Sequence, residues 1–213
     1  MTRPEMPCCR ALVRFALVVA ASAAAASLWA QARPEPGLLL DAQTWCAEVA
    51  PASTGARADD GWFRLVPQDR GVDVRVVKPG DPLAGVADAL YFRQRGLALQ
   101  QGRHIGYGYP EVLQRPRMGV PHELSLAGTR FSVMADYVDE GIEYAIGYGG
   151  ETHSYLLGAP GADRTVVRAI ADLDGDRRPD FVIDVDGAVY LLLSTQARPG
   201  RNAPTAQYAE RAS

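Results

Sequence analysis

The sequence is poor in cysteine, histidine and lysine: its 213 residues include three Cys, three His and one Lys. Two of the cysteines, Cys8 and Cys9, belong to an N-terminal segment that we expect to be removed, which leaves Cys46 alone and excludes an intramolecular disulfide. A single thiol in an exported chain is either buried or paired with another chain. The apolar neighbours Trp45 and Ala47 favour burial.

The sequence also lacks an excess of charge of one sign and any familiar catalytic motif. Its 22 basic and 25 acidic residues give a net charge of −3, which argues against a nucleic-acid partner, since such binders carry a concentrated basic face. No nucleophile elbow, phosphate-binding loop or zinc-protease motif is present. A hydrophobic content of 47% nevertheless indicates an ordinary folded protein.

The longest charge-free apolar run, residues 15–30, has 16 residues, whereas a membrane-spanning helix needs roughly 20. Three arginines precede this run, and Ala30-Gln31-Ala32 follows the pattern of a signal-peptidase site. We therefore predict that residues 1–32 are a secretory signal peptide and that the protein is periplasmic or secreted. The alternative is an uncleaved membrane anchor, the one case in which a membrane would be a partner.

The remaining chain divides by composition into three parts. Residues 33–60 are expected to be an N-terminal leader, in which the stretch 38–49 could form a short helix or a strand. Residues 61–195 are predicted to form a single β-rich domain. The polar tail, residues 196–213, is expected to be flexible.

Short strand patterns separated by glycine-containing turns dominate the predicted domain. The turns are expected at Ala127-Gly128-Thr129, Gly149-Gly150 and Asp186-Gly187. This spacing predicts an all-β or mainly β fold with little helix, built from antiparallel hairpins in a sandwich, a barrel or a propeller-like stack of sheets. Five tyrosines could line a sugar-binding face or simply pack on a sheet: Tyr107, Tyr109, Tyr144, Tyr148 and Tyr155.

One segment carries recognisable chemistry. Asp172, Asp174, Asp176 and Asp180 occupy positions 1, 3, 5 and 9 of one loop, where unpaired carboxylates would repel one another. Ca²⁺ accepts six to eight oxygen ligands in a flexible geometry, so these four residues and the backbone carbonyl of Arg178, at position 7, are the predicted ligands. Mg²⁺ fits less well because it demands octahedral geometry, and Zn²⁺ lacks nitrogen or sulfur ligands here.

The run from Asp172 to Asp180, followed by a strand and by Gly187, resembles the calcium-loop repeat of FG-GAP and VCBS proteins. In that family such loops join strands of β-propeller blades. The resemblance covers about 25 residues, 170–194, and implies a bound, structural Ca²⁺. It departs from the family at Arg177, which stands where these loops usually have glycine, and only one copy is present.

These observations predict an exported, non-catalytic binding or envelope-associated protein, with a protein or glycan partner and a Ca²⁺-stabilised hairpin loop. One alternative is a secreted hydrolase whose active site is assembled from separated residues, with His104, His122 and His153 as candidates. A second alternative is a metal-free structural protein of the envelope.

Overall fold

The structure, a computed structural model, describes residues 36–51, 61–79, 86, 88–108 and 115–209. The predicted signal peptide, residues 1–32, lies outside the described residues. No helix in the described part of the chain has the length and apolar character needed to cross a membrane.

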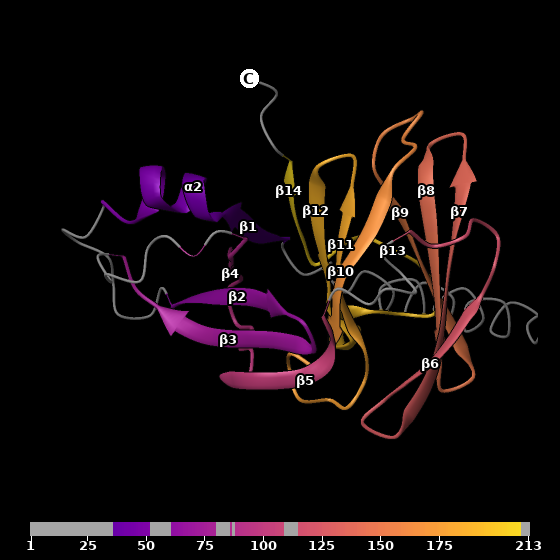
Figure 1. Cartoon of the computed structure of the whole chain (residues 1–213), viewed down its shortest axis with the longest axis horizontal. Coiled ribbons are helices and arrows are strands. Elements are labelled where there is room, and N and C mark those ends of the chain that lie inside the picture. The colour runs from indigo at the N-terminus through magenta and orange to yellow at the C-terminus, as the bar shows by residue number, and fades with distance from the viewer. Residues whose placement is uncertain (1–35, 52–60, 80–85, 87, 109–114, 210–213) are drawn as a thin grey trace, which may run out of the picture. The chain divides into compact units, whose positions relative to one another are not determined.

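The fold is mainly β, as the sequence predicts, and its larger part is a closed barrel of nine strands (Figure 1). The order around the barrel is β1-β14-β12-β11-β10-β5-β3-β2-β4, and β4 pairs with β1 to close it. The barrel strands are β1 (Gly37–Asp41), β2 (Trp62–Gln68), β3 (Gly71–Val77), β4 (Leu90–Arg93), β5 (Gly102–Gly108), β10 (Thr165–Ala171), β11 (Asp180–Val185), β12 (Ala188–Leu192) and β14 (Ala206–Ala209).

A second sheet of five strands has the order β13-β9-β8-β7-β6. Its strands are β6 (His122–Leu126), β7 (Thr129–Val138), β8 (Gly141–Tyr148), β9 (Glu151–Leu157) and β13 (Gly200–Asn202). The described helices are short: α2 (Ala42–Thr44), the π-helical η1 (Trp45–Val49) and the 3-10 helix η2 (Ser194–Gln196).

Two buried apolar clusters hold these sheets. The first combines side chains from eight barrel strands and therefore fills the barrel: Leu39, Phe63, Leu65, Val72, Val74, Leu90, Phe92, Ala169, Ala171, Val182, Val189, Leu191 and Ala206. The second joins the opposite face of β10–β12 to β7, β8 and β9, with Phe131 and Phe181 packed edge to face at 6.0 Å between ring centroids. Figure 1 shows these strands of the second sheet beside β10.

The three predicted hairpins are confirmed, but the first turn is one residue shorter than predicted, because Thr129 is the first residue of β7 and pairs with Leu126. Ala127-Gly128, Gly149-Gly150 and Asp186-Gly187 each place two successive residues at positive φ: 49° and 86°, 62° and 81°, and 50° and 85°. Two positive φ values in a two-residue loop match the right-handed twist of the flanking strands. The register that follows each turn is therefore fixed locally.

The tail, residues 196–213, is expected to be flexible, but its described part contains β13 and β14. Of these, β14 belongs to the barrel, as does β1 from the N-terminal leader. In the tail, β14 pairs antiparallel with β12 and parallel with β1. In the leader, β1 is followed at once by α2 and η1, so both predicted alternatives, strand and short helix, occur. The pairing of β1 with β14 joins segments about 170 positions apart, and no local pattern reveals such a contact.

A third buried cluster lies where η1 covers the outer side of β2 and β4. The ring of Trp45 stacks on Tyr91 at 4.6 Å between centroids and meets Trp62 edge to face at 5.0 Å. Cys46 is half-buried against this cluster and forms no disulfide within the described chain. Of the five tyrosines singled out above, Tyr144, Tyr148 and Tyr155 are buried in the packing of the second sheet.

Candidate metal centre

The acidic loop connects two neighbouring antiparallel strands of the barrel. Asp172 follows the last residue of β10, and Asp180 is the first residue of β11. Within the loop, Gly175 has φ of +86° and Arg177 has φ of +67°. Both residues thus have a left-handed backbone conformation, which is typical of tight turns.

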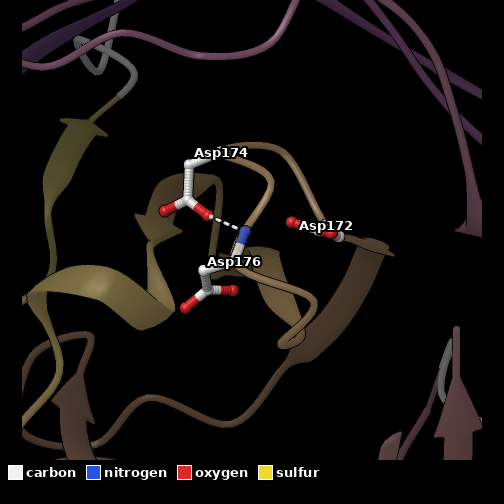
Figure 2. A group of neighbouring side chains, drawn as sticks. All are labelled: Asp172, Asp174 and Asp176. Carbon is white, nitrogen blue, oxygen red and sulfur yellow. Dashed lines mark hydrogen bonds between the residues drawn. The ribbon is translucent and has the colours of Figure 1, made fainter. Parts of the chain in front are cut away.

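Three carboxylates of this loop come together. Asp172, Asp174 and Asp176 each offer an oxygen within 4.8 Å of the other two, and Figure 2 shows all three on the same turn of chain. Oxygens that bind one Ca²⁺ at 2.3–2.6 Å lie at most about 5 Å apart. The spacing of the three oxygens therefore suits a single ion of this size.

Backbone N–H groups of the loop itself hold these carboxylates in place. Asp172 accepts hydrogen bonds from the N–H of Gly175 at 2.7 Å and from the N–H of Arg177 at 3.0 Å. The N–H of Asp176 donates to Asp174 at 3.3 Å, the dashed line in Figure 2. Side-chain positions fixed by the backbone cost little further ordering when an ion binds.

Two hydroxyl groups, which the sequence interpretation missed, contact the same carboxylates. Thr195 donates to Asp174 at 2.6 Å, and the hydroxyl of Ser194 shares its one proton between Asp176 at 3.0 Å and Asp180 at 2.8 Å. Both lie in η2, which is separated from the end of β12 by one residue. The predicted turn at Asp186-Gly187 could have indicated these two residues. The hairpin that it forms pairs Phe181 with Leu192, so the residues that follow Leu192 return to the acidic loop before β11.

Asp180, a predicted ligand, has a different environment from the other three. Its side chain is 1% exposed, and its two oxygens accept the N–H of Leu173 at 2.7 Å, the N–H of Ser194 at 2.7 Å and the hydroxyl of Ser194 at 2.8 Å. With both oxygens engaged by these donors, Asp180 fastens the two ends of the loop to η2.

Arg178, predicted to offer its carbonyl oxygen, donates its N–H to Asp176 at 2.7 Å. Its guanidinium lies 5.5 Å from the centre of the Tyr148 ring and 3.9 Å from the Asp176 carboxylate. The neighbouring carbonyl, that of Arg177, accepts the hydroxyl of Thr129 at 2.9 Å and so ties the loop to β7. The carbonyl of Arg178 stays a predicted ligand.

Burial and the charge of neighbouring carboxylates raise the pKa of Asp174 and that of Asp180. The pKa of Asp174 is raised by burial and by Asp176 and Asp172, against the hydrogen bond from Thr195. Burial, and then the charge of Asp174, raises the pKa of Asp180 well above its usual value, although Ser194 and Leu173 oppose this. A cation among the three carboxylates would offset the repulsion.

The histidines of the alternative hydrolase site are not brought together. His122, Val133, Ile146 and His153 lie in one cross-strand row of the second sheet, so three strand spacings, roughly 14 Å, separate the two imidazoles. His153 is buried and stacks on Tyr148 at 4.4 Å. His104 lies on β5 of the barrel and donates to the carbonyl of Gln100.

No family model, curated protein or solved structure matches this chain. What the fold and the site define is thus a class: a mainly β protein with a cluster of three aspartates that could hold a metal ion.

Proposed function

We propose that the loop from Asp172 to Asp180 binds one Ca²⁺ and that this ion has a structural role in an exported, non-catalytic binding protein. The observation that carries the proposal is the grouping of three carboxylate oxygens within 4.8 Å on a loop whose backbone already orients them. The resemblance to the FG-GAP and VCBS calcium loop supports the choice of Ca²⁺, and so does a ligand set made only of oxygens.

A structural role follows from what the loop connects. The aspartates of the loop join β10, β11 and η2 through side-chain hydrogen bonds to Ser194 and Thr195, and Arg177 joins the loop to β7. An ion bound to Asp172, Asp174 and Asp176 would stabilise the loop in the conformation that makes these contacts. No imidazole, the commonest general base, belongs to the group of three.

The affinity is expected to be modest. Arg177 and Arg178 lie in the loop and lower its negative potential, which places the dissociation constant in the range of extracellular calcium modules, on the order of 10⁻⁴–10⁻³ M. At 10⁻⁴ M, a Ca²⁺ concentration of 1 mM would stabilise the protein by about 1.4 kcal/mol. For a protein of this size the unfolding midpoint would then rise by roughly 3–6 °C.

The test is thermal unfolding of residues 33–213 with EGTA, with CaCl₂ up to 10 mM and with MgCl₂ as the ionic control. The proposal predicts a rise that is selective for Ca²⁺ in the native protein and in Asp139→Asn, an aspartate in another turn. Asp174→Asn should abolish the rise. An unchanged midpoint up to 10 mM Ca²⁺ would reject the metal site and favour the metal-free structural protein.

A further inference from the structure

Two adjoining cavities lie at the mouth of the barrel beside the turn between β11 and β12, and no residue of the acidic loop lines either of them. The smaller, about 300 Å³, is lined by residues at the ends of β1, β4, β12 and β14, among them Asp41 and Tyr208. The larger, about 820 Å³, lies between β7, β10 and the turn after β11. Arg168, Asp184 and Gly187 line both cavities, which therefore adjoin, and we refer to the two together as the groove. Both volumes are of the size that small ligands occupy, and barrel mouths are common ligand sites.

An ion pair forms the boundary between the two cavities. The guanidinium of Arg168 lies 3.3 Å from the carboxylate of Asp184, and these side chains are only 30% and 20% exposed. Asp184 also accepts the N–H of Gly187 at 2.9 Å, which fixes its position. The pair keeps further hydrogen-bonding capacity, because a guanidinium has five N–H donors and a carboxylate about four acceptor sites.

Hydrogen bonds of Asp186 and Tyr137 fix the residues that line the larger cavity. Asp186 accepts the N–H of Asp163 at 3.3 Å and the N–H of Arg164 at 3.1 Å, so its carboxylate shapes the segment before β10. Tyr137 donates its hydroxyl to the carbonyl of Asp163 at 2.8 Å, while 51% of the residue stays exposed. The groove thus has a large aromatic ring anchored at one wall.

The charges of the larger cavity are balanced. It is lined by three arginines and three aspartates, namely Arg115, Arg164, Arg168, Asp163, Asp184 and Asp186. A ligand with a strong charge of either sign would have to compete with the pairs Arg168–Asp184 and Arg164–Asp186. A hydroxyl group both donates and accepts, so a neutral ligand with many hydroxyls can bond to both members of a pair without separating them.

From these features we infer that the groove at Arg168 and Asp184 binds a neutral oligosaccharide, with the exposed ring of Tyr137 as the surface against which a sugar ring packs. Tyrosine suits this role because it combines an apolar face with a polar tip. The inference rests on the proposed function as a binding protein, and it names the partner class as glycan. It uses none of the proposed calcium ligands, so the two claims fail separately.

The experiment is an NMR titration of the ¹⁵N-labelled protein, at saturating Ca²⁺ and again in EGTA, with three probes: neutral hexasaccharides of glucose, neutral hexasaccharides of N-acetylglucosamine, and anionic oligogalacturonate. We expect at least one neutral probe to give saturable shifts of the amides of Arg164, Arg168 and Gly187. Tyr137→Ala and Arg168→Met should each weaken this binding by about tenfold or more, as the loss of a ring platform or of a charged donor predicts.

Asp174→Asn is the matched control, because it disables the proposed calcium loop and should leave sugar binding in place. Thermal unfolding of Tyr137→Ala and Arg168→Met identifies any variant that fails to fold, in which case Tyr137→Leu and Arg168→Gln replace them. The inference is overturned if neither neutral probe binds at 10 mM, if the shifts lie elsewhere, or if only the anionic probe binds. Sugar binding by a protein whose unfolding midpoint Ca²⁺ leaves unchanged would reject the calcium site alone.

Discussion

The carboxylate of Asp174 accepts a 2.6 Å hydrogen bond from the hydroxyl of Thr195, a residue 21 positions later in the chain. This bond joins the loop after β10 to the helix after β12, across the whole β11–β12 hairpin. The acidic cluster therefore links two segments of the chain, the loop between β10 and β11 and the helix η2, and is not an isolated surface loop. The stability that a bound ion adds here, and the stability that each aspartate contributes without an ion, can be measured separately.

Asp180→Asn separates the structural carboxylate from the proposed ligands. An amide offers only one acceptor oxygen, so either the N–H of Leu173 or the N–H of Ser194 would face an NH₂ group. We expect the free energy of unfolding to fall by about 1–3 kcal/mol, measured by urea denaturation in EGTA. The Ca²⁺-dependent gain in stability should persist. If Asp180→Asn retained its stability in EGTA but lost the Ca²⁺ effect, Asp180 would be a ligand after all.

Asp174→Asn should have the opposite effect on the metal-free protein. The amide can donate to Thr195 and accept from Asp176 while it removes a charge from the cluster. Because the folded pKa of Asp174 is raised, the folded state binds a proton more tightly than the unfolded chain, and the ionised group lowers stability at neutral pH.

In EGTA at pH 7, Asp174→Asn should therefore unfold at a higher temperature than the native protein. This advantage should shrink as the pH is lowered through the folded pKa toward the unfolded value of 3.8, because the native carboxyl becomes protonated too. A variant that is less stable than the native protein at pH 7 in EGTA would contradict the account of repulsion in the cluster.

Arg177→Gly tests the one position at which the loop departs from the family that it resembles. Arg177 has φ of +67°, a conformation that costs a residue with a Cβ atom about 1 kcal/mol and costs glycine little. Arg177→Ala is the matched control, since it removes the same charge and keeps the strain. We expect the glycine variant to be more stable than the alanine variant by about 1 kcal/mol in chemical denaturation. Equal stabilities would show that the backbone is not strained here.

Tyr148→Phe tests the burial of the tyrosine beneath Arg178. Burial raises the pKa of Tyr148 to about 12, with Arg178 opposing the rise and Asp176 and Asp180 adding to it. The unfolded chain ionises near pH 10, so the contribution of Tyr148 is fully present below pH 10 and is lost as the pH rises toward 12. Tyr148→Phe should lose less stability than the native protein between pH 10 and pH 12. Identical losses would contradict the raised pKa.

Much of the fold could be predicted because the signals are local. The sequences Ala127-Gly128 and Asp186-Gly187 are typical of tight hairpin turns, and each turn fixes the register of its hairpin. The closure of the barrel could not be predicted, since the pairing of β1 with β14 depends on segments at opposite ends of the chain. The polar residues of the tail made it look flexible, but its backbone completes the sheet, and Thr205 and Ala206 are buried.

The candidate site, too, could be predicted from the sequence only where its residues are close together in the chain. The spacing of Asp172, Asp174 and Asp176 predicted a cluster because all three lie on one turn of chain. The same spacing predicts Asp180 as a further ligand, and in the structure its carboxylate accepts hydrogen bonds from Leu173 and Ser194. Ser194 lies outside the loop, so the spacing of the aspartates alone could not predict this contact.

Equilibrium dialysis with radioactive Ca²⁺ is the most direct test of the central claim, that this loop holds one calcium ion. The native protein and Asp180→Asn should each bind one Ca²⁺ per chain with a dissociation constant on the order of 10⁻⁴–10⁻³ M, and excess Mg²⁺ should displace it poorly. Asp174→Asn should bind none in this range. Absence of binding by the native protein, or equal binding by Asp174→Asn, would contradict the calcium site at residues 172–180.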